Sequence, residues 1–380
     1  MGIVIGNAGY ESILSIVGLS WIVRLFLVRE NPLPILFKHP IVVPWLLMFA
    51  SILISLAVNG PGSKGAAHDI VFFRHLLFLA AMLDVSRRLP VVRYFLIGMA
   101  GGILLAIANI LSANAFGWDL MGKPLARYTS KLKEASRIAG LFAYLGPMFI
   151  AWAFSLAPVS GKIKCVLLAL GVAALVVVVD MRVRTAILAT GTGLSFWVIY
   201  LLYRRLAVKS LLVIIPIVLL VGGVGTMYVL NQPLDSVYDR FGFYKIAWAV
   251  FQENPIFGVG ISSFQDATRE MAASGKVAPF IAPDGKKWLA AEMMHAHNLP
   301  LMVLSCTGIV GLVLFCWLSF RIAKVVYCQS EETFRYGLVL WPPIFLVIGL
   351  TGWSIYANWY HALFVYLTVF TGSVRRTVRT

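Results

Sequence analysis

The chain has 380 residues, of which 60% are hydrophobic and 13% are charged, and its formal net charge is +16. This composition excludes a soluble globular protein, because too few polar residues are present to cover a water-exposed surface. Apolar stretches long enough to cross a hydrocarbon layer of about 30 Å as helices recur along the sequence. We therefore predict an all-α polytopic membrane protein with residues 1–380 forming a single integral membrane domain.

Hydropathy predicts about eleven to twelve spans. The expected spans are residues 11–28, 41–58, 69–86, 92–113, 137–157, 163–180, 185–203, 211–230, 298–321, 335–351 and 353–372. Basic residues gather in short loops between them, which argues against a nucleic-acid-binding face. These loops include those with Arg87, Lys162, Arg204, Arg321 and Arg375. All fall on one side if the spans alternate, and the positive-inside rule makes that side cytoplasmic.

Three segments on the other side also carry positive charge: residues 115–136, the turn 180–184 and the large loop 231–297. Long translocated loops escape the positive-inside rule, so their lysines can simply be a solvated rim that faces lipid headgroups. Residues 115–136 could equally rim a donor cavity or bind an anionic lipid. The turn that carries Arg182 and Arg184 is too short for that explanation, so we expect the function to use at least one of these arginines.

The large loop 231–297, expected outside the membrane, contains a predicted amphipathic helix over residues 237–252. Apolar or aromatic residues recur there at spacings of three and four, at Phe241, Tyr244, Ala247, Trp248 and Phe251. We expect this helix to lie along the outer membrane–water boundary. Asn254 and Pro255 end it, and Gly258 and Gly260 follow in a turn that permits close approach of another backbone segment.

His295 and His297 share a short external segment at the mouth of the span 298–321. Imidazoles have an ordinary pKa of about 6.5, so one of them could act as a general base. A His-x-His pair could also bind a metal, but further ligands would have to come from scattered carboxylates such as Glu292 or Asp266, and we predict no metal site. For His295 we favour a structural interfacial histidine, and for His297 a functional role.

Arginine suits a phosphate or pyrophosphate, because its planar guanidinium group donates two parallel hydrogen bonds and keeps its charge. Arg184 at the mouth of one span, Arg240 at the start of the amphipathic helix and His297 at the mouth of another could converge on one external site. Such a group suits glycosyl transfer from a lipid pyrophosphate: the arginines would stabilise the departing pyrophosphate, and a neutral imidazole would deprotonate the acceptor hydroxyl.

Several motifs together resemble the signature of the O-antigen ligase and polymerase superfamily. They are the stretch Asp239–Phe264, the sequence His295-Ala-His-Asn298 with Gly308 and Gly311, and an upstream arginine motif at Arg184-Thr-Ala. The resemblance covers roughly residues 165–325. It implies an inverting, metal-independent and cofactor-free glycosyltransferase of the bacterial inner membrane, which takes a glycan from undecaprenyl pyrophosphate at the periplasmic face.

The resemblance also implies residue roles. Arg184 and Arg240 would hold the pyrophosphate and His297 would activate the acceptor hydroxyl, with Arg182, His295 and Asn298 as further substrate-binding residues. The His-x-His-Asn segment favours a ligase that moves the glycan onto lipid A core. A polymerase that moves it onto another repeat unit, or a protein O-oligosaccharyltransferase, remains an alternative.

A transporter or flippase is the rival from another class, because charge within spans, such as Arg24, Arg74 and His75, often marks a transport pathway. Arg24 and Arg74, however, are expected close enough to span ends to extend their charges toward the headgroups. The sequence also shows no inverted-repeat symmetry of the kind that many transporters carry.

Overall fold

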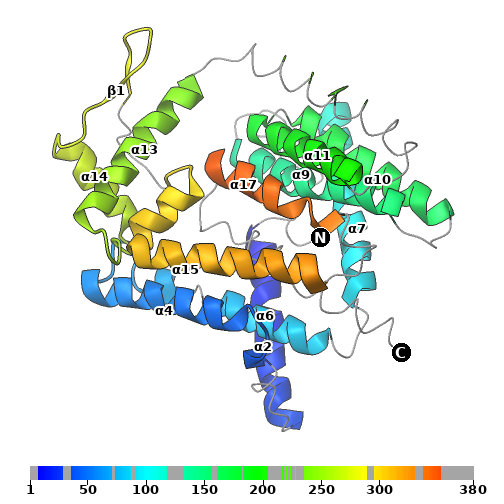
Figure 1. Cartoon of the computed structure of the whole chain (residues 1–380), viewed down its shortest axis with the longest axis horizontal. Coiled ribbons are helices and arrows are strands. Elements are labelled where there is room, and N and C mark those ends of the chain that lie inside the picture. The colour runs from blue at the N-terminus through cyan, green and yellow to red at the C-terminus, as the bar shows by residue number, and fades with distance from the viewer. Residues whose placement is uncertain are drawn as a thin grey trace.

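The computed structural model describes residues 7–28, 36–70, 73–86, 91–117, 132–155, 161–181, 183–203, 235–288, 295–329 and 337–351, with isolated positions between 216 and 227. Helices dominate this part of the chain (Figure 1). Four of them are long and apolar enough to cross a membrane: α4 (Val42–Asn59), α10 (Gly161–Asp180), α11 (Arg184–Tyr203) and α15 (Leu299–Gln329). The predicted all-α polytopic membrane fold is confirmed.

The described chain has further helices and two short strands. They are α2 (Asn7–Val28), α5 (Ala67–Ile70), α6 (Arg74–Val85), α7 (Val91–Phe116), α9 (Leu132–Ser155), α13 (Asp235–Glu253), α14 (Phe264–Ala273), α17 (Trp341–Thr351) and the antiparallel strands β1 (Phe280–Ile281) and β2 (Lys287–Trp288). The predicted span 353–372 lies outside the described residues, and so does nearly all of the span 211–230.

Three expected boundaries are wrong. The span 69–86 contains two helices, α5 and α6, and Asp69 in α5 is buried and accepts hydrogen bonds from the backbone amides of Ile261 and Ser262 in the large loop. Helix α9 begins at Leu132, inside the segment 115–136 that was expected to be an external loop. Helix α15 continues to Gln329 instead of ending near residue 321.

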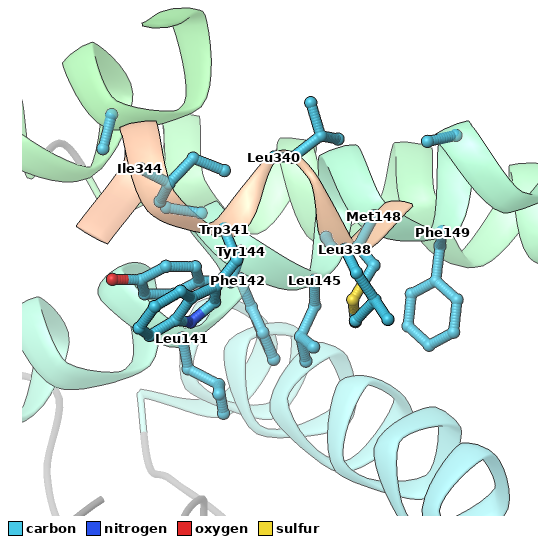
Figure 2. Close-up of a cluster of buried hydrophobic side chains, with 14 of the residues drawn as sticks. Leu141, Phe142, Tyr144, Leu145, Met148, Phe149, Leu338, Leu340, Trp341 and Ile344 are labelled. Carbon is cyan, nitrogen blue, oxygen red and sulfur yellow. The ribbon is translucent and has the colours of Figure 1, made fainter. Parts of the chain in front are cut away.

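Helices α9, α10, α11 and α17 share the larger hydrophobic core. Tyr144 of α9 and Trp341 of α17 stack with their ring centroids 6.3 Å apart, and Leu338 and Ile344 lie beside them (Figure 2). Helices α9 and α10 pack closely at Gly171, which has no side chain; a Cβ atom added there would overlap the Ile150 side chain. Close packing at small residues is what holds helices together in lipid.

A second core joins α4 to α15, which run side by side (Figure 1), and α13 packs against α15. The buried face of α13 includes Ile246, Ala247 and Val250. Phe241 and Trp248, from the predicted aromatic face, are 44% and 47% exposed. A helix over residues 237–252 is therefore confirmed, but the predicted stripe is not its buried face: Ile246, Ala247 and Val250 pack on the protein, whereas Phe241 and Trp248 lie on the exposed side.

Arg24 is paired within the protein. Its guanidinium group forms an ion pair with the buried Asp84 of α6, and Trp21 donates a 2.9 Å hydrogen bond to the same carboxylate. A charge in an apolar bundle is stabilised by a paired and hydrogen-bonded partner. Arg24 thus joins α2 to α6, which weakens the argument for a transport pathway at this residue.

Helix α15 is broken at Gly308, where φ is 65° and ψ is −166°. The turn after α13 fills the break: the amides of Val259 and Gly260 each donate a 2.9 Å hydrogen bond, to the carbonyls of Ser305 and Cys306. A Cβ atom at Gly258 would overlap the backbone at Cys306, so the predicted close approach is confirmed. The broken helix thereby keeps its backbone groups paired, as lipid surroundings require.

Candidate functional site

Segments that are distant in sequence meet at one end of the bundle. The large loop is fixed to the end of α4 by Asn59, whose side-chain amide donates a 2.8 Å hydrogen bond to the carbonyl of Gly258. It is fixed to the following connection by Ser63, whose amide and hydroxyl each donate a 2.7 Å bond to Asp266. Near the start of α4, which is the opposite end of that helix, Arg321 of α15 bonds instead to the carbonyl of Pro40. The large loop therefore packs onto one end of the helices.

Arg240 and Arg184 come together at this end. Arg184 is the first residue of α11 and Arg240 lies in the second turn of α13, and both side chains are partly buried. Burial lowers the pKa of Arg240, and the charge of Arg184 lowers it further, whereas Tyr244 raises it. Two repelling guanidinium groups beside a helix N-terminus provide a favourable environment for an anion.

His297 lies near Arg240 and has an unusual backbone conformation. Among the described residues it is the one non-glycine residue with positive φ, 50°. Its ring stacks on Phe243 of α13 with centroids 5.1 Å apart, and its centroid lies 4.1 Å from that of His295. A residue other than glycine keeps such a conformation only where its surroundings hold it, and functional sites are where this is commonly found.

The imidazole of His297 is kept neutral. Burial, the neighbouring His295 and the charge of Arg240, in that order of importance, lower its pKa to about 3. A neutral imidazole can accept a proton, which is what a general base requires. The same low pKa makes His297 a weak base. The charge of Arg240 contributes to this low pKa as long as no anion neutralises it.

Tyr244 and Asn298 complete the group. The Tyr244 hydroxyl and the Asn298 side-chain amide each donate a 3.3 Å hydrogen bond to the carbonyl of Leu350, in the last turn of α17. Burial raises the pKa of Tyr244, whereas Arg240 and a hydrogen bond with Asn298 lower it. The sequence interpretation assigned Tyr244 to the apolar stripe, although its position four residues after Arg240 places both on one helix face.

The carboxylate considered as a metal ligand lies in a different arrangement. Asp266 accepts hydrogen bonds from Ser63, and these bonds lower its pKa. Within the described ranges, no three His, Cys, Asp or Glu side chains gather as metal ligands would. Glu292, the other carboxylate considered, lies outside them.

The structure thus brings together five of the predicted site residues: Arg184, Arg240, His295, His297 and Asn298. Arg182 lies outside the described residues, as do residues 118–131 of the basic segment 115–136. Sequence reasoning missed Tyr244, Phe243 and the carbonyl of Leu350. Nothing in the sequence identifies a backbone carbonyl more than fifty residues from the histidine as its neighbour.

A family model described as O-antigen ligase matches residues 134–316. The matched range includes Arg184, Arg240 and His297 and overlaps most of the segment whose motifs show the resemblance. It does not distinguish ligases from polymerases. No curated protein matches the chain.

Proposed function

We propose, on the premise that this chain belongs to the O-antigen ligase superfamily, that it transfers a glycan from undecaprenyl pyrophosphate to an acceptor hydroxyl. Membership makes it a membrane glycosyltransferase of the O-antigen ligase or polymerase type. Within that type we propose ligation of O-antigen to lipid A core, at the periplasmic face of the bacterial inner membrane, with inversion at the anomeric carbon and without a metal or cofactor.

The proximity of Arg184 to Arg240, with His297 beside Arg240, carries this proposal. The two like charges in this partly buried site repel each other. An anion bound between them would attract both and so offset the repulsion. A pyrophosphate fits best, because two planar guanidinium groups can each donate a pair of hydrogen bonds to it. The N-terminus of α11 adds favourable partial positive charge.

The proposed reaction gives His297 and the two arginines separate roles. The acceptor hydroxyl oxygen attacks the anomeric carbon of the donor sugar from the face opposite the pyrophosphate, while His297 takes the hydroxyl proton. The bond between that carbon and the pyrophosphate oxygen breaks, and the arginines stabilise the negative charge that develops on the departing group. Attack from the opposite face inverts the anomeric configuration.

Donor binding and base strength are coupled in this arrangement. The charge of Arg240 lowers the pKa of His297, so a bound pyrophosphate that neutralises this charge would raise it. The imidazole would then become a stronger base when the donor is in place. A general base is most effective when its pKa approaches the working pH.

The test is complementation of a bacterial strain that lacks its own O-antigen ligase. Gel analysis of lipopolysaccharide should reveal long O-antigen ladders with the wild-type chain and none with His297→Ala. A suitable control is His39→Ala, because His39 lies beside Pro40 at the opposite end of the bundle. Equal amounts of each protein in the membrane fraction are required for the comparison.

The polymerase uses the same donor chemistry, so the acceptor decides between the two activities. A well-inserted wild-type chain that gives no ladder in this strain would contradict ligation. Restoration of chain length in a polymerase-deficient strain would then establish the polymerase, and protein-linked glycan would establish the protein O-oligosaccharyltransferase.

A further inference from the structure

We propose that Tyr244 and Asn298 are positioning residues, which fix Arg184, Arg240 and His297 relative to one another through the carbonyl of Leu350. Together, Tyr244, Asn298 and this carbonyl form what we term the Leu350 junction. The catalytic part of this inference rests on the proposed function, whereas the structural part does not.

The junction joins three elements through one oxygen atom. Tyr244 on α13 and Asn298 before α15 each donate a 3.3 Å hydrogen bond to the Leu350 carbonyl of α17, and the two side chains also bond to each other. The side-chain oxygen Oδ1 of Asn298 accepts a 3.0 Å hydrogen bond from the backbone amide of Leu301. Both polar ends of the Asn298 side chain are therefore engaged within the protein.

The Leu350 carbonyl of α17 is the shared acceptor, because the hydroxyl of Tyr244 and the side-chain amide of Asn298 both donate to it. Because α17 packs against α11, which begins with Arg184, the junction links the donor-binding arginine of α11 to that of α13.

The junction also explains how His297 keeps its positive φ. Asn298 follows His297 directly, and its side chain is tied to both the first turn of α15 and the end of α17. Phe243, which stacks on His297, precedes Tyr244. The ring that stacks on the imidazole is thus adjacent in sequence to one member of the junction and His297 itself is adjacent to another, so loosening the junction would let His297 relax toward water.

The first test measures glycan transfer by the purified full-length protein for Tyr244→Phe, Asn298→Ala and the double variant. Each single variant should reduce kcat/KM by about tenfold, because small displacements of catalytic groups are costly. The double variant should be no slower than the slower single variant, since both act through one oxygen. Tyr94→Phe is the matched control, because Tyr94 lies 60% exposed on α7. Multiplying losses in the double variant would overturn the proposal.

The pH profile of the same variants separates positioning from a general loss of structure. Freed from the junction, His297 should be less buried, so its pKa should rise from about 3 toward the ordinary value. The acid limb of kcat/KM should then move upward by at least about one pH unit. A lower rate with an unmoved acid limb would contradict the positioning role.

A second test does not depend on activity. Diethyl pyrocarbonate modifies neutral imidazoles, and fragment-ion mass spectrometry assigns the label to His297 separately from His295. Labelling of His297 at neutral pH should be several-fold faster in Tyr244→Phe and Asn298→Ala than in wild type or Tyr94→Phe. Unchanged labelling would overturn the junction. If His297 is labelled faster in the two variants but the wild-type protein itself makes no product, the junction is upheld and only the proposed function is contradicted.

Discussion

The core shared by α9, α10, α11 and α17 and the candidate site are held together by different forces. The core relies on apolar side chains and on close approach at small residues such as Gly171. The site relies on directional hydrogen bonds between distant segments, as between Tyr244 and Leu350 or between Asn59 and Gly258. The bundle thus provides the frame, whereas a few polar contacts determine where the charged groups meet.

The largest expected effect is on chemistry alone. His297→Ala should lower the transfer rate by a factor of about 10² to 10⁴, the usual contribution of a general base, while membrane insertion and thermal stability stay near those of wild type. Transfer rates from purified protein and a thermal-shift assay check both halves of this prediction. A variant that unfolds would indicate that the site also supports the frame.

Replacing either arginine by lysine should have the next largest effect. Arg184→Lys and Arg240→Lys keep the positive charge but lose the two-point contact with phosphate, so we expect losses of about tenfold to a hundredfold in kcat/KM for the donor. Steady-state kinetics with varied donor concentration measures this. Wild-type turnover in both variants would show that point charge alone suffices and would contradict the proposed clamp.

Gly308→Ala tests the frame instead of the site. A Cβ atom there would overlap the carbonyl of Ile256, and φ of 65° is unfavourable for alanine, so we expect destabilisation by about 1–3 kcal/mol or more. Gly101→Ala is the matched control, because a Cβ atom on Gly101 of α7 has no contact within 4 Å. Thermal or denaturant unfolding in detergent compares the two variants. Equal stabilities would show that the break in α15 is not held as described.

A pH profile sharpens the electrostatic side of the comparison. With a pKa of about 3, His297 stays neutral and able to act as a base down to about pH 4. Its neutral form is lost only when the pH falls further. We therefore expect kcat/KM for the donor to be nearly constant between pH 7 and 5. An ordinary histidine with a pKa of 6.5 would already cause a fall of about tenfold at pH 5.5.

Metal removal should have the smallest effect. The proposed mechanism uses arginines for the pyrophosphate and an imidazole for the proton, so EDTA should leave the transfer rate of the purified protein unchanged. Loss of activity that one added divalent ion restores would instead return His295 and His297 to the role of metal ligands.

Much of the frame and part of the site could be predicted from the sequence. Helices such as α4 and α10 lie close to the predicted residues, because apolar length alone determines them. The predicted convergence of Arg184, Arg240 and His297 rested on residue types at the mouths of spans and on motif resemblance. The structure supports it through the electrostatic contacts of Arg240.

The rest depended on contacts that hydropathy cannot reveal. Asp69, within the predicted span 69–86, binds the backbone of the large loop through its carboxylate, and Arg24 pairs with Asp84 sixty residues away. The break in α15 depends on the turn that fills it. In each case one polar group recognises a partner distant in sequence, and no local periodicity records such a pair.

The most direct test of the central claim is transfer in proteoliposomes that contain only the purified protein, an undecaprenyl-pyrophosphate-linked glycan and lipid A core. The account predicts product with wild type, and with His297→Ala it predicts donor binding of similar affinity and product formation slower by a factor of about 10² to 10⁴. Product formation by His297→Ala at the wild-type rate would contradict the assignment of His297 as the base in an arginine-clamped donor site.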